Sequence, residues 1–250
     1  MKNLFGKYAA TAAVILAAAC GALVSATAGV PPAEKSSQHA FYAFNTDEGE
    51  MNISFSEYPD GTGTVAAFIT TTDDDRRREV LHYVSVLDGL RETAPAGCNT
   101  PPAVHQMSAR QVFRDAEYIY AWETAAAVTE YDMSKGTDTT LVRRITVDKE
   151  SVDIAGYLYL LCRRPETARN VSAILDRGSV YVTDVESTIQ HTVLYGKTRI
   201  FHTALTSADG RNGEIILTVT ANETPMPVYF YISIDGKHIK GRIKRSATHE

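Results

Sequence analysis

The sequence has little of the features that mark a membrane-spanning or nucleic-acid-binding protein. After residue 28 it contains no apolar run near the roughly 18 residues that a membrane-crossing helix needs. Its formal net charge is −5, and removal of an N-terminal segment carrying Lys2 and Lys7 would make it −7. A nucleic-acid-binding domain is typically basic. We therefore expect neither a transmembrane span nor a nucleic-acid partner.

The common catalytic and metal-binding motifs are also missing. The seven histidines are scattered, with no H-E-x-x-H or H-x-H pattern. There is no phosphate-binding loop, and no G-x-S-x-G follows the first 28 residues. The acidic run 73–75 is followed directly by the arginines 76–78, which is typical of a solvated turn and not of a calcium loop. We therefore expect no catalytic residue, no metal site and no cofactor, and we keep an enzyme only as a third alternative.

Cysteine is scarce, with only Cys20, Cys98 and Cys162 in the chain. In an oxidising compartment Cys98 and Cys162 could form one disulfide. It would close a loop of about 65 residues and contribute roughly 4 kcal/mol in the chain-entropy model. Two buried free thiols are the alternative, because the sequence does not say whether the two residues are close in space.

The N-terminal segment predicts export. Two lysines precede an uncharged, alanine-rich stretch, and residues 26–28 form a small-x-small cleavage site. This pattern predicts a signal peptide over residues 1–28 and a periplasmic location. The alternatives are an uncleaved membrane anchor and a lipoprotein anchored at Cys20. Residues 29–38 are rich in proline and serine, so we expect a disordered lead-in.

Most of the remaining chain has the character of β-strands. The segment "MNISFSEY" (51–58) alternates apolar and polar residues, and "PDGTG" (59–63) is typical of a hairpin turn. Further expected strands are 39–45, 64–72, 79–87, 179–185, 188–207, 214–222, 228–234 and 237–245. We expect one β-rich domain over 39–250, with a candidate subdomain break at 94–107, where proline and glycine gather. The stretch 108–135 fits a helix or strands, and we favour a hairpin over 117–147.

One segment, residues 148–165, predicts a helix. Asp148 or Ser151 could cap its start, and Pro165 would end it. The apolar residues fall at helical spacing, and the helix is apolar enough to lie across a sheet. The predicted fold class is mostly β (α+β), with an antiparallel curved sheet or half-barrel and one main covering helix.

The last expected strand, 237–245, carries an unusual concentration of positive charge. In a strand its basic residues share one face, and Ile239, Gly241 and Ile243 share the other. One interpretation is the solvated outer face of a terminal edge strand, where lysines discourage aggregation. The alternative is contact with an anionic partner, such as lipid headgroups or an acidic protein surface. The residues of this candidate contact are His238, Lys240, Arg242 and Lys244.

The order of these elements resembles a group of exported bacterial proteins known only as a domain of unknown function. The matching places are "FYAFNTDEGEMNISFSEYPDGTGTVAAF", "DIAGYLYLLCRRP" and "MPVYFYISIDGKHIKGRI". The resemblance implies a curved antiparallel sheet, similar to the half-barrel carriers that handle lipids and lipoproteins in the periplasm. Residues 94–135 match nothing in that pattern, and the resemblance brings no functional residues with it.

The expected function is that of a non-catalytic binding or carrier module of the cell envelope for a lipid, an acyl chain or an envelope protein. A curved sheet with a helix across its mouth would form an apolar groove. The expected lining is Val152, Ala155, Leu158, Leu161, Tyr229 and Tyr231. The alternative is a structural or assembly factor that acts through protein contacts, with the groove filled by its own side chains.

Overall fold

The computed structural model describes residues 37–47, 49–73, 76–90, 104–113, 116–124, 127–133, 140–147 and 150–249. One compact unit spans Lys35–Glu250. The predicted signal peptide 1–28, Cys20 and nearly all of the lead-in 29–38 lie outside the described residues, so these expectations stay predictions.

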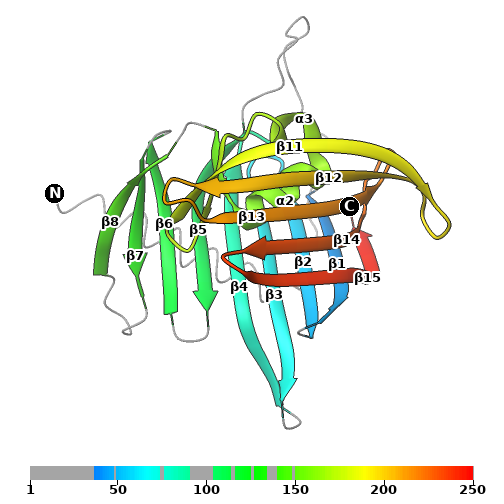
Figure 1. Ribbon diagram of the computed structural model, residues 1–250, viewed down its shortest axis with the longest axis horizontal. Helices are drawn as coiled ribbons and strands as arrows, with labels where there is room; N and C mark the ends of the chain where they lie inside the picture. Colours follow the sequence, from blue (N-terminus) through cyan, green and yellow to red (C-terminus); the bar gives the residue numbers. More distant parts are fainter. Residues whose placement is uncertain are drawn as a thin grey trace, which may run out of the picture. The chain divides into compact units, whose positions relative to one another are not determined.

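The described residues form one sheet of 15 strands, ordered β8-β7-β6-β5-β4-β3-β2-β1-β15-β14-β13-β12-β11-β10-β9 (Figure 1). Neighbours pair antiparallel, except the parallel pair β9 and β10. The strands are β1 (Gln38–Thr46), β2 (Glu50–Glu57), β3 (Gly63–Asp73), β4 (Arg76–Asp88), β5 (His105–Phe113), β6 (Ala116–Thr124), β7 (Ala127–Asp132), β8 (Thr140–Thr146), β9 (Ser151–Asp153), β10 (Ala173–Asp176), β11 (Ser179–Thr192), β12 (Gly196–Ser207), β13 (Asn212–Thr220), β14 (Pro227–Ile234) and β15 (Lys237–His249). This confirms the predicted mostly-β antiparallel fold.

Two meanders meet at the pair formed by the first and last strands. Strands β1 to β8 follow one another across one half of the sheet, and β9 to β15 follow one another across the other. The β1–β15 ladder joins the halves, with Phe44 opposite Ile243. Because β15 therefore lies between β14 and β1, the expectation of a terminal edge strand at 237–245 is wrong. The pairing partner is nearly 200 residues away in the sequence, beyond the reach of local patterns.

Local sequence accounts for many of the hairpins. In β12 the residues Phe201, Thr203 and Leu205 are buried and alternate with exposed ones, the period of a strand with one face on a core. The turn between β14 and β15 has positive φ at Asp235 (53°) and Gly236 (75°). These angles suit the two-residue hairpin turns that Asp-Gly favours, between the strands expected at 228–234 and 237–245.

Helix α2 (Ile154–Arg163) lies between the two halves of the sheet (Figure 1). Nine of its ten residues are buried, and it contacts β3 and β4 on one side and β10 and β13 on the other. A short helix α3 (Pro165–Ala168) follows it. The predicted main helix is thus confirmed, but its start differs: residues 151–153 pair with β10 as strand β9, and Asp153 is the N-cap.

The middle of the chain contains more strand than the sequence predicted. The expected hairpin 117–147 is the three-stranded run β6, β7 and β8. Strand β5 (His105–Phe113) was not expected, and it pairs with both β4 and β6. The sheet therefore runs on from β4 to β5 across the candidate break at 94–107, of which residues 94–103 lie outside the described ranges.

The main core fills the space around α2. The ring of Phe55 meets that of Tyr159 edge to face at a centroid distance of 5.3 Å, and Phe44 meets Phe230 at 5.1 Å. Such pairs add to the free energy gained by burial. A Cβ atom on Gly241 would lie 2.5 Å from Cε1 of Phe230, so this position of β15 needs the absence of a side chain.

Replacing Gly241 with alanine tests this packing. The added methyl group must displace the ring of Phe230, so we expect Gly241→Ala to lower the free energy of unfolding by about 1–3 kcal/mol. Urea denaturation followed by circular dichroism measures the change. Ser246→Ala, at an exposed position of the same strand, is the control, and equal midpoints for the two variants would contradict the packing argument.

A buried polar cluster joins the N-terminal half of the sheet to β9 and β10. Ser85 Oγ donates to Asp153 Oδ1 at 2.6 Å, and the Tyr83 hydroxyl donates to Asp176 Oδ1 at 2.8 Å. Arg177 Nε lies 2.9 Å from the other oxygen of Asp176. Asp153 and Asp176 are essentially inaccessible to solvent. Hydrogen bonds to charged groups at such depth orient the two halves of the sheet around the helix.

Burial raises the pKa of Asp153 from its usual 3.8 to about 6. The hydrogen bonds from Ser85 and from the backbone N–H of Gly156 act in the opposite direction. Within the described residues Oδ2 of Asp153 has no hydrogen-bond partner. The native state therefore holds a proton on Asp153 between about pH 4 and pH 6 that the unfolded chain has already released. The contribution of this group to the free energy of unfolding falls as the pH rises through that window.

Asp153→Asn isolates this titration. The asparagine keeps an oxygen that can cap α2 but does not ionise. Near pH 4 the variant and the wild type should have similar stability. From pH 4 to pH 6 the free energy of unfolding of the wild type should fall relative to that of the variant, by an amount on the order of 3 kcal/mol. Urea denaturation across this pH range measures the difference, with Asp184→Asn on the exposed face of β11 as the control. A difference that does not change with pH would contradict the raised pKa.

Candidate functional site

A pocket of about 190 Å³ lies between the hairpin of β11 and β12 and the C-terminal end of α2. Its apolar lining includes Leu161, Phe201, Val219 and Pro225. Two basic residues, Lys197 and Arg199, line its other side. The pocket is therefore amphipathic, with aliphatic and aromatic groups next to two cationic groups.

Strand alternation places cationic and apolar groups of the pocket on the same face of the sheet. Residues 197, 199 and 201 of β12 are two apart, so their side chains project from the same face of the sheet. In the ladders Ile189 of β11 is opposite Arg199, and Arg199 is opposite Val219 of β13. One row across three strands thus consists of an isoleucine, an arginine and a valine. The guanidinium of Arg199 lies 6.0 Å from the centroid of the Phe201 ring, a cation–π contact.

The wall opposite the hairpin is the connection between β13 and β14. Thr220 bonds both ends of this connection: its N–H donates to the carbonyl of Met226, and its Oγ1 accepts from the Met226 N–H, each at 2.9 Å. The N–H of Ala221 donates to the carbonyl of Lys197 at 2.9 Å. These bonds fix the backbone on both sides of the pocket, so the site is formed in advance of any ligand.

Cys162 lines this pocket as a buried thiol, without a disulfide partner among the described residues. Its Sγ is 3.5 Å from the carbonyl oxygen of Pro225. Burial raises the pKa of this thiol to about 12, so it is protonated at neutral pH, and the thiol is a weak nucleophile. Cys98, its predicted disulfide partner, lies outside the described residues, and the pairing stays a prediction.

The two cations of the pocket have no acidic partner. Across the described part of the chain, no ion pair involves Lys197 or Arg199. Some other basic groups of the same half of the sheet are paired with carboxylates. Arg211, for example, pairs with both Asp209 and Asp235 at 2.9 Å. Uncompensated cations at the mouth of an apolar pocket attract an anion.

The size of the pocket limits what it can hold. Pockets that enclose a whole small ligand usually measure about 300–1,000 Å³, so this site has room for only part of such a ligand. Among the described residues no set of three or more His, Cys, Asp or Glu side chains is arranged to hold a metal ion.

The structure does not bring the six expected groove residues together. Val152, Ala155, Leu158 and Leu161 belong to the main core and are buried, and of these only Leu161 reaches the pocket. Tyr229 and Tyr231 are half-buried and alternate with the buried Phe230, so they lie on the outer face of β14. The space between helix and sheet is filled by side chains.

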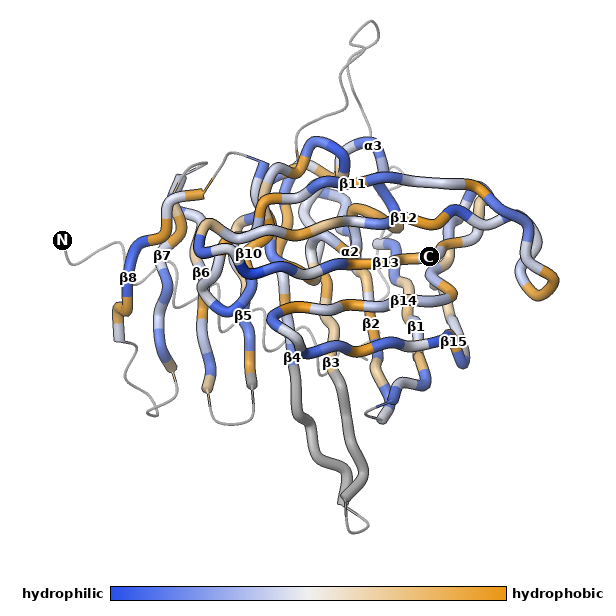
Figure 2. The backbone as a smooth tube through the Cα atoms, viewed as in Figure 1, coloured by the Kyte–Doolittle hydropathy of each residue, from blue (hydrophilic) through white to orange (hydrophobic). Residues whose placement is uncertain are grey.

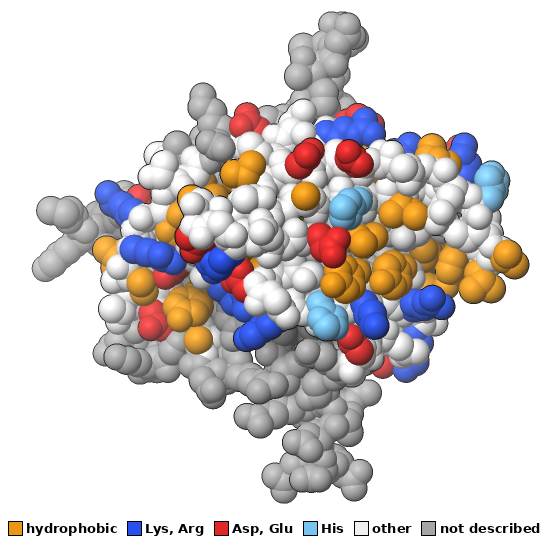
Figure 3. Space-filling model, in the orientation of Figure 1, with side chains coloured by type: hydrophobic (Ala, Val, Ile, Leu, Met, Phe, Trp, Pro, Cys, Tyr) orange, Lys and Arg blue, Asp and Glu red, His pale blue; other side chains and the backbone are white. Residues whose placement is uncertain are grey.

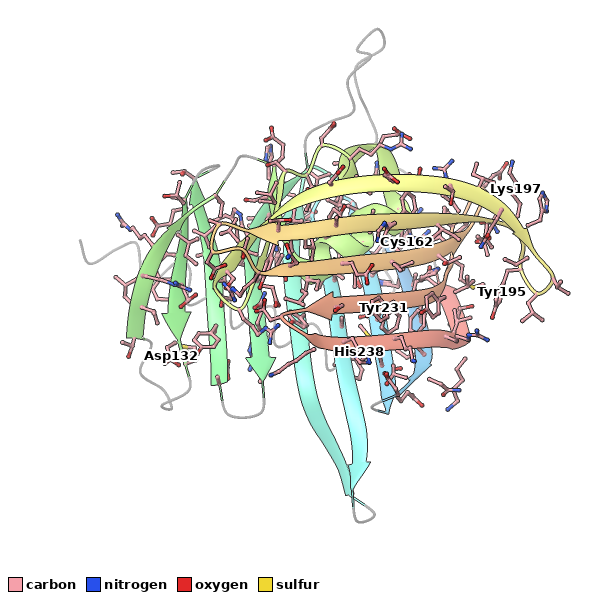
Figure 4. All side chains as sticks on the ribbon, in the orientation of Figure 1. Asp132, Cys162, Tyr195, Lys197, Tyr231 and His238 are labelled. Atoms are coloured by element: carbon pink, nitrogen blue, oxygen red, sulfur yellow. The ribbon has the colours of Figure 1, made fainter. Side chains whose placement is uncertain are left out.

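The basic face expected on β15 is exposed to solvent. His238, Lys240, Arg242 and Lys244 are exposed. The ring of Tyr231 on β14 stacks on His238 at a centroid distance of 6.0 Å (Figure 4). Lys244 Nζ is 3.0 Å from Glu50, and His238 Nε2 is 4.0 Å from Asp47. Carboxylates on neighbouring elements therefore offset part of this charge.

Sequence reasoning missed the cationic side of the pocket. The segment 188–207 was expected as strand, and its period of two already places Lys197 and Arg199 on one face. A further signal was the absence of any aspartate or glutamate from residue 187 to residue 208. The apolar side, from α2 and the β13–β14 connection, is supplied by residues distant in sequence.

Comparisons with known proteins include a similarity to a solved structure. No family model matches the chain, and no curated protein matches it. A crystal structure of a β-barrel-like protein of domain of unknown function DUF1849 from Brucella abortus aligns over 86% of this chain and 98% of that one, with a TM-score of 0.48 and 8% identity. In the ranges that the structure describes, neither helix has the length and hydrophobicity to cross a bilayer.

Proposed function

We propose that this protein is a non-catalytic binding module of the cell envelope, and that its pocket holds the anionic end of a lipid or acyl chain. The observation that carries the proposal is the pair of uncompensated cations, Lys197 and Arg199, beside the apolar groups of Leu161, Phe201 and Val219. A carboxylate or phosphate would bind the cations, and the first methylene groups would contact the apolar lining.

The residues that line the pocket indicate where the remainder of a bound lipid would lie. Ile189 borders the pocket and is 53% exposed, so an acyl chain leaving the pocket would pass over this side chain. The pocket is too small to enclose a complete lipid. A module of this kind would hold one end of an amphiphile and leave the remainder for a membrane or a second protein.

The expected location of the protein and the chemistry of the pocket also support the proposal. The N-terminal pattern of residues 1–28 supports export to the periplasm, where lipids and lipoproteins are handled outside the inner membrane. A binding role is also supported by the chemistry of the pocket. Its thiol is kept protonated by burial, and among the described residues no histidine or carboxylate borders the pocket.

Removal of the two cations tests the pocket. The variant Lys197→Ala/Arg199→Ala loses two charge-assisted contacts, so its affinity for a fluorescent long-chain fatty acid should fall roughly tenfold or more. The matched control is Lys240→Ala/Arg242→Ala, which removes the same charge from the outer face of β14 and β15 and should bind as the wild type does. Fluorescence titration of protein purified without detergent from a bacterial periplasm measures both.

The same preparation identifies the natural ligand. Mass spectrometry of organic extracts should find a stoichiometric anionic lipid on the wild type and on the control variant, and little on Lys197→Ala/Arg199→Ala. A ligand-free wild type, or equal losses from the two double variants, would overturn the assignment of the pocket.

A second candidate is an assembly factor that acts through protein contacts. The observation that favours it is the filled space around α2, where the expected groove residues pack into the core. Its contact surface would be the exposed basic face of β15 with Tyr231. Cross-linking from Lys240 in the periplasm that captures an acidic envelope protein, together with a ligand-free pocket, would favour this function over lipid binding.

A further inference from the structure

The hairpin of β11 and β12 reaches beyond the strand next to it. The ladder between β12 and β13 ends at the pair Thr198–Thr220, whereas β11 and β12 continue to pair as far as Thr192 and Gly196. Residues 191–196 therefore form a two-stranded extension past the last paired residues of β13. Figure 1 shows this yellow extension projecting at the right of the molecule.

The end of this extension is apolar. Val193 and Leu194 are 103% and 78% exposed, and Figure 2 shows a hydrophobic tip between hydrophilic segments. Hairpin turns usually consist of Gly, Asn, Asp and Pro, so two large aliphatic residues at the turn are not explained by the turn itself. We call residues 192–196 the hairpin tip.

Hydrogen bonds hold the hairpin tip in a defined turn. The N–H of Tyr195 donates to Thr192 Oγ1 at 3.2 Å, and this hydroxyl donates to the carbonyl of Gly196 at 3.4 Å. Gly196 has a φ of 66°, in the region that glycine adopts without strain. Val193 and Leu194 are thus presented outward by an ordered turn.

The charged residues of the hairpin closest to the tip are basic. Lys197 and Arg199 lie within a few residues of the tip, and Figure 4 labels Tyr195 and Lys197 on this part of the hairpin. The nearest acidic residue on β11 is Glu186, about 23 Å from Val193 along an extended strand. On a chain with a formal net charge of −5, this end of the hairpin is a local cationic region, and Figure 3 shows basic and hydrophobic side chains gathered there.

We propose that the hairpin tip docks the protein on an anionic membrane surface, with Val193 and Leu194 inserted among the lipid chains. Exposed aliphatic groups backed by Lys and Arg fit the interface of an anionic bilayer. A tyrosine next to the aliphatic pair suits the headgroup region, where amphipathic rings gather. A second copy of the chain fits less well, because joining two tips would bring two cationic regions together.

This surface is distinct from the proposed ligand contacts. Neither Val193 nor Leu194 lines the pocket, so the inference stands whether or not the pocket holds an acyl chain. The pocket opens under the same hairpin, however. Docking by the tip would place its two cations next to the headgroups of the membrane.

Co-sedimentation with vesicles tests the proposal. The probe is unilamellar vesicles of phosphatidylglycerol and phosphatidylcholine in equal parts, with phosphatidylcholine alone as the comparison. Wild type should bind the anionic vesicles and bind phosphatidylcholine alone more weakly. Val193→Asp/Leu194→Asp should bind the anionic vesicles at least roughly tenfold more weakly. Val182→Asp, at a 60% exposed position of the same strand away from the tip, is the matched control and should bind as the wild type does.

Two further measurements separate the outcomes. Fatty-acid titration without vesicles should give the same affinity for the tip variant and the wild type, which shows that the variant is folded with an intact pocket. Failure of the wild type to bind anionic vesicles, or equal binding by the tip variant and Val182→Asp, would overturn the proposal. So would sedimentation velocity that finds a dimer for the wild type and a monomer for the tip variant, since the tip would then be a contact between copies.

Discussion

The rest of the structure depends on the burial of helix α2 on every side. A helix with nine of ten residues removed from water needs apolar partners all round, and a flat sheet covers only one face. The sheet supplies both sides because its two meanders are joined through β1 and β15. The polar N-terminus of the helix is then held in the interior by Asp153, whose buried carboxyl is the main polar group at that end.

The enclosed helix also determines where a ligand can bind. Its side chains fill the interior, so the expected groove between helix and sheet is absent from the part of the chain that the structure describes. Space remains where α2 ends, beneath the overhanging β11–β12 hairpin. The pocket therefore combines the last apolar residues of the helix with the inner face of a strand that extends beyond its neighbours.

Charge is distributed unevenly between two basic surfaces. On β15 two of the basic groups have carboxylates nearby, His238 with Asp47 and Lys244 with Glu50, and an exposed pair of this kind contributes little free energy. At the hairpin, Lys197 and Arg199 have apolar neighbours instead. An anionic group gains most where cations are uncompensated and partly shielded from water, which is why we assign ligand binding and membrane docking to the hairpin.

The sequence by itself determined most of the strands, the hairpin turn at 59–63 and the existence of one apolar helix, because alternation and turn chemistry are local properties. It also placed Lys240 and Arg242 together on one face of β15. Only the tertiary structure decided that β15 pairs with β1, that α2 is enclosed, and that a pocket forms beside Arg199. These depend on contacts between segments far apart in the chain, since a periodic pattern shows which face of an element is apolar but not which element covers it.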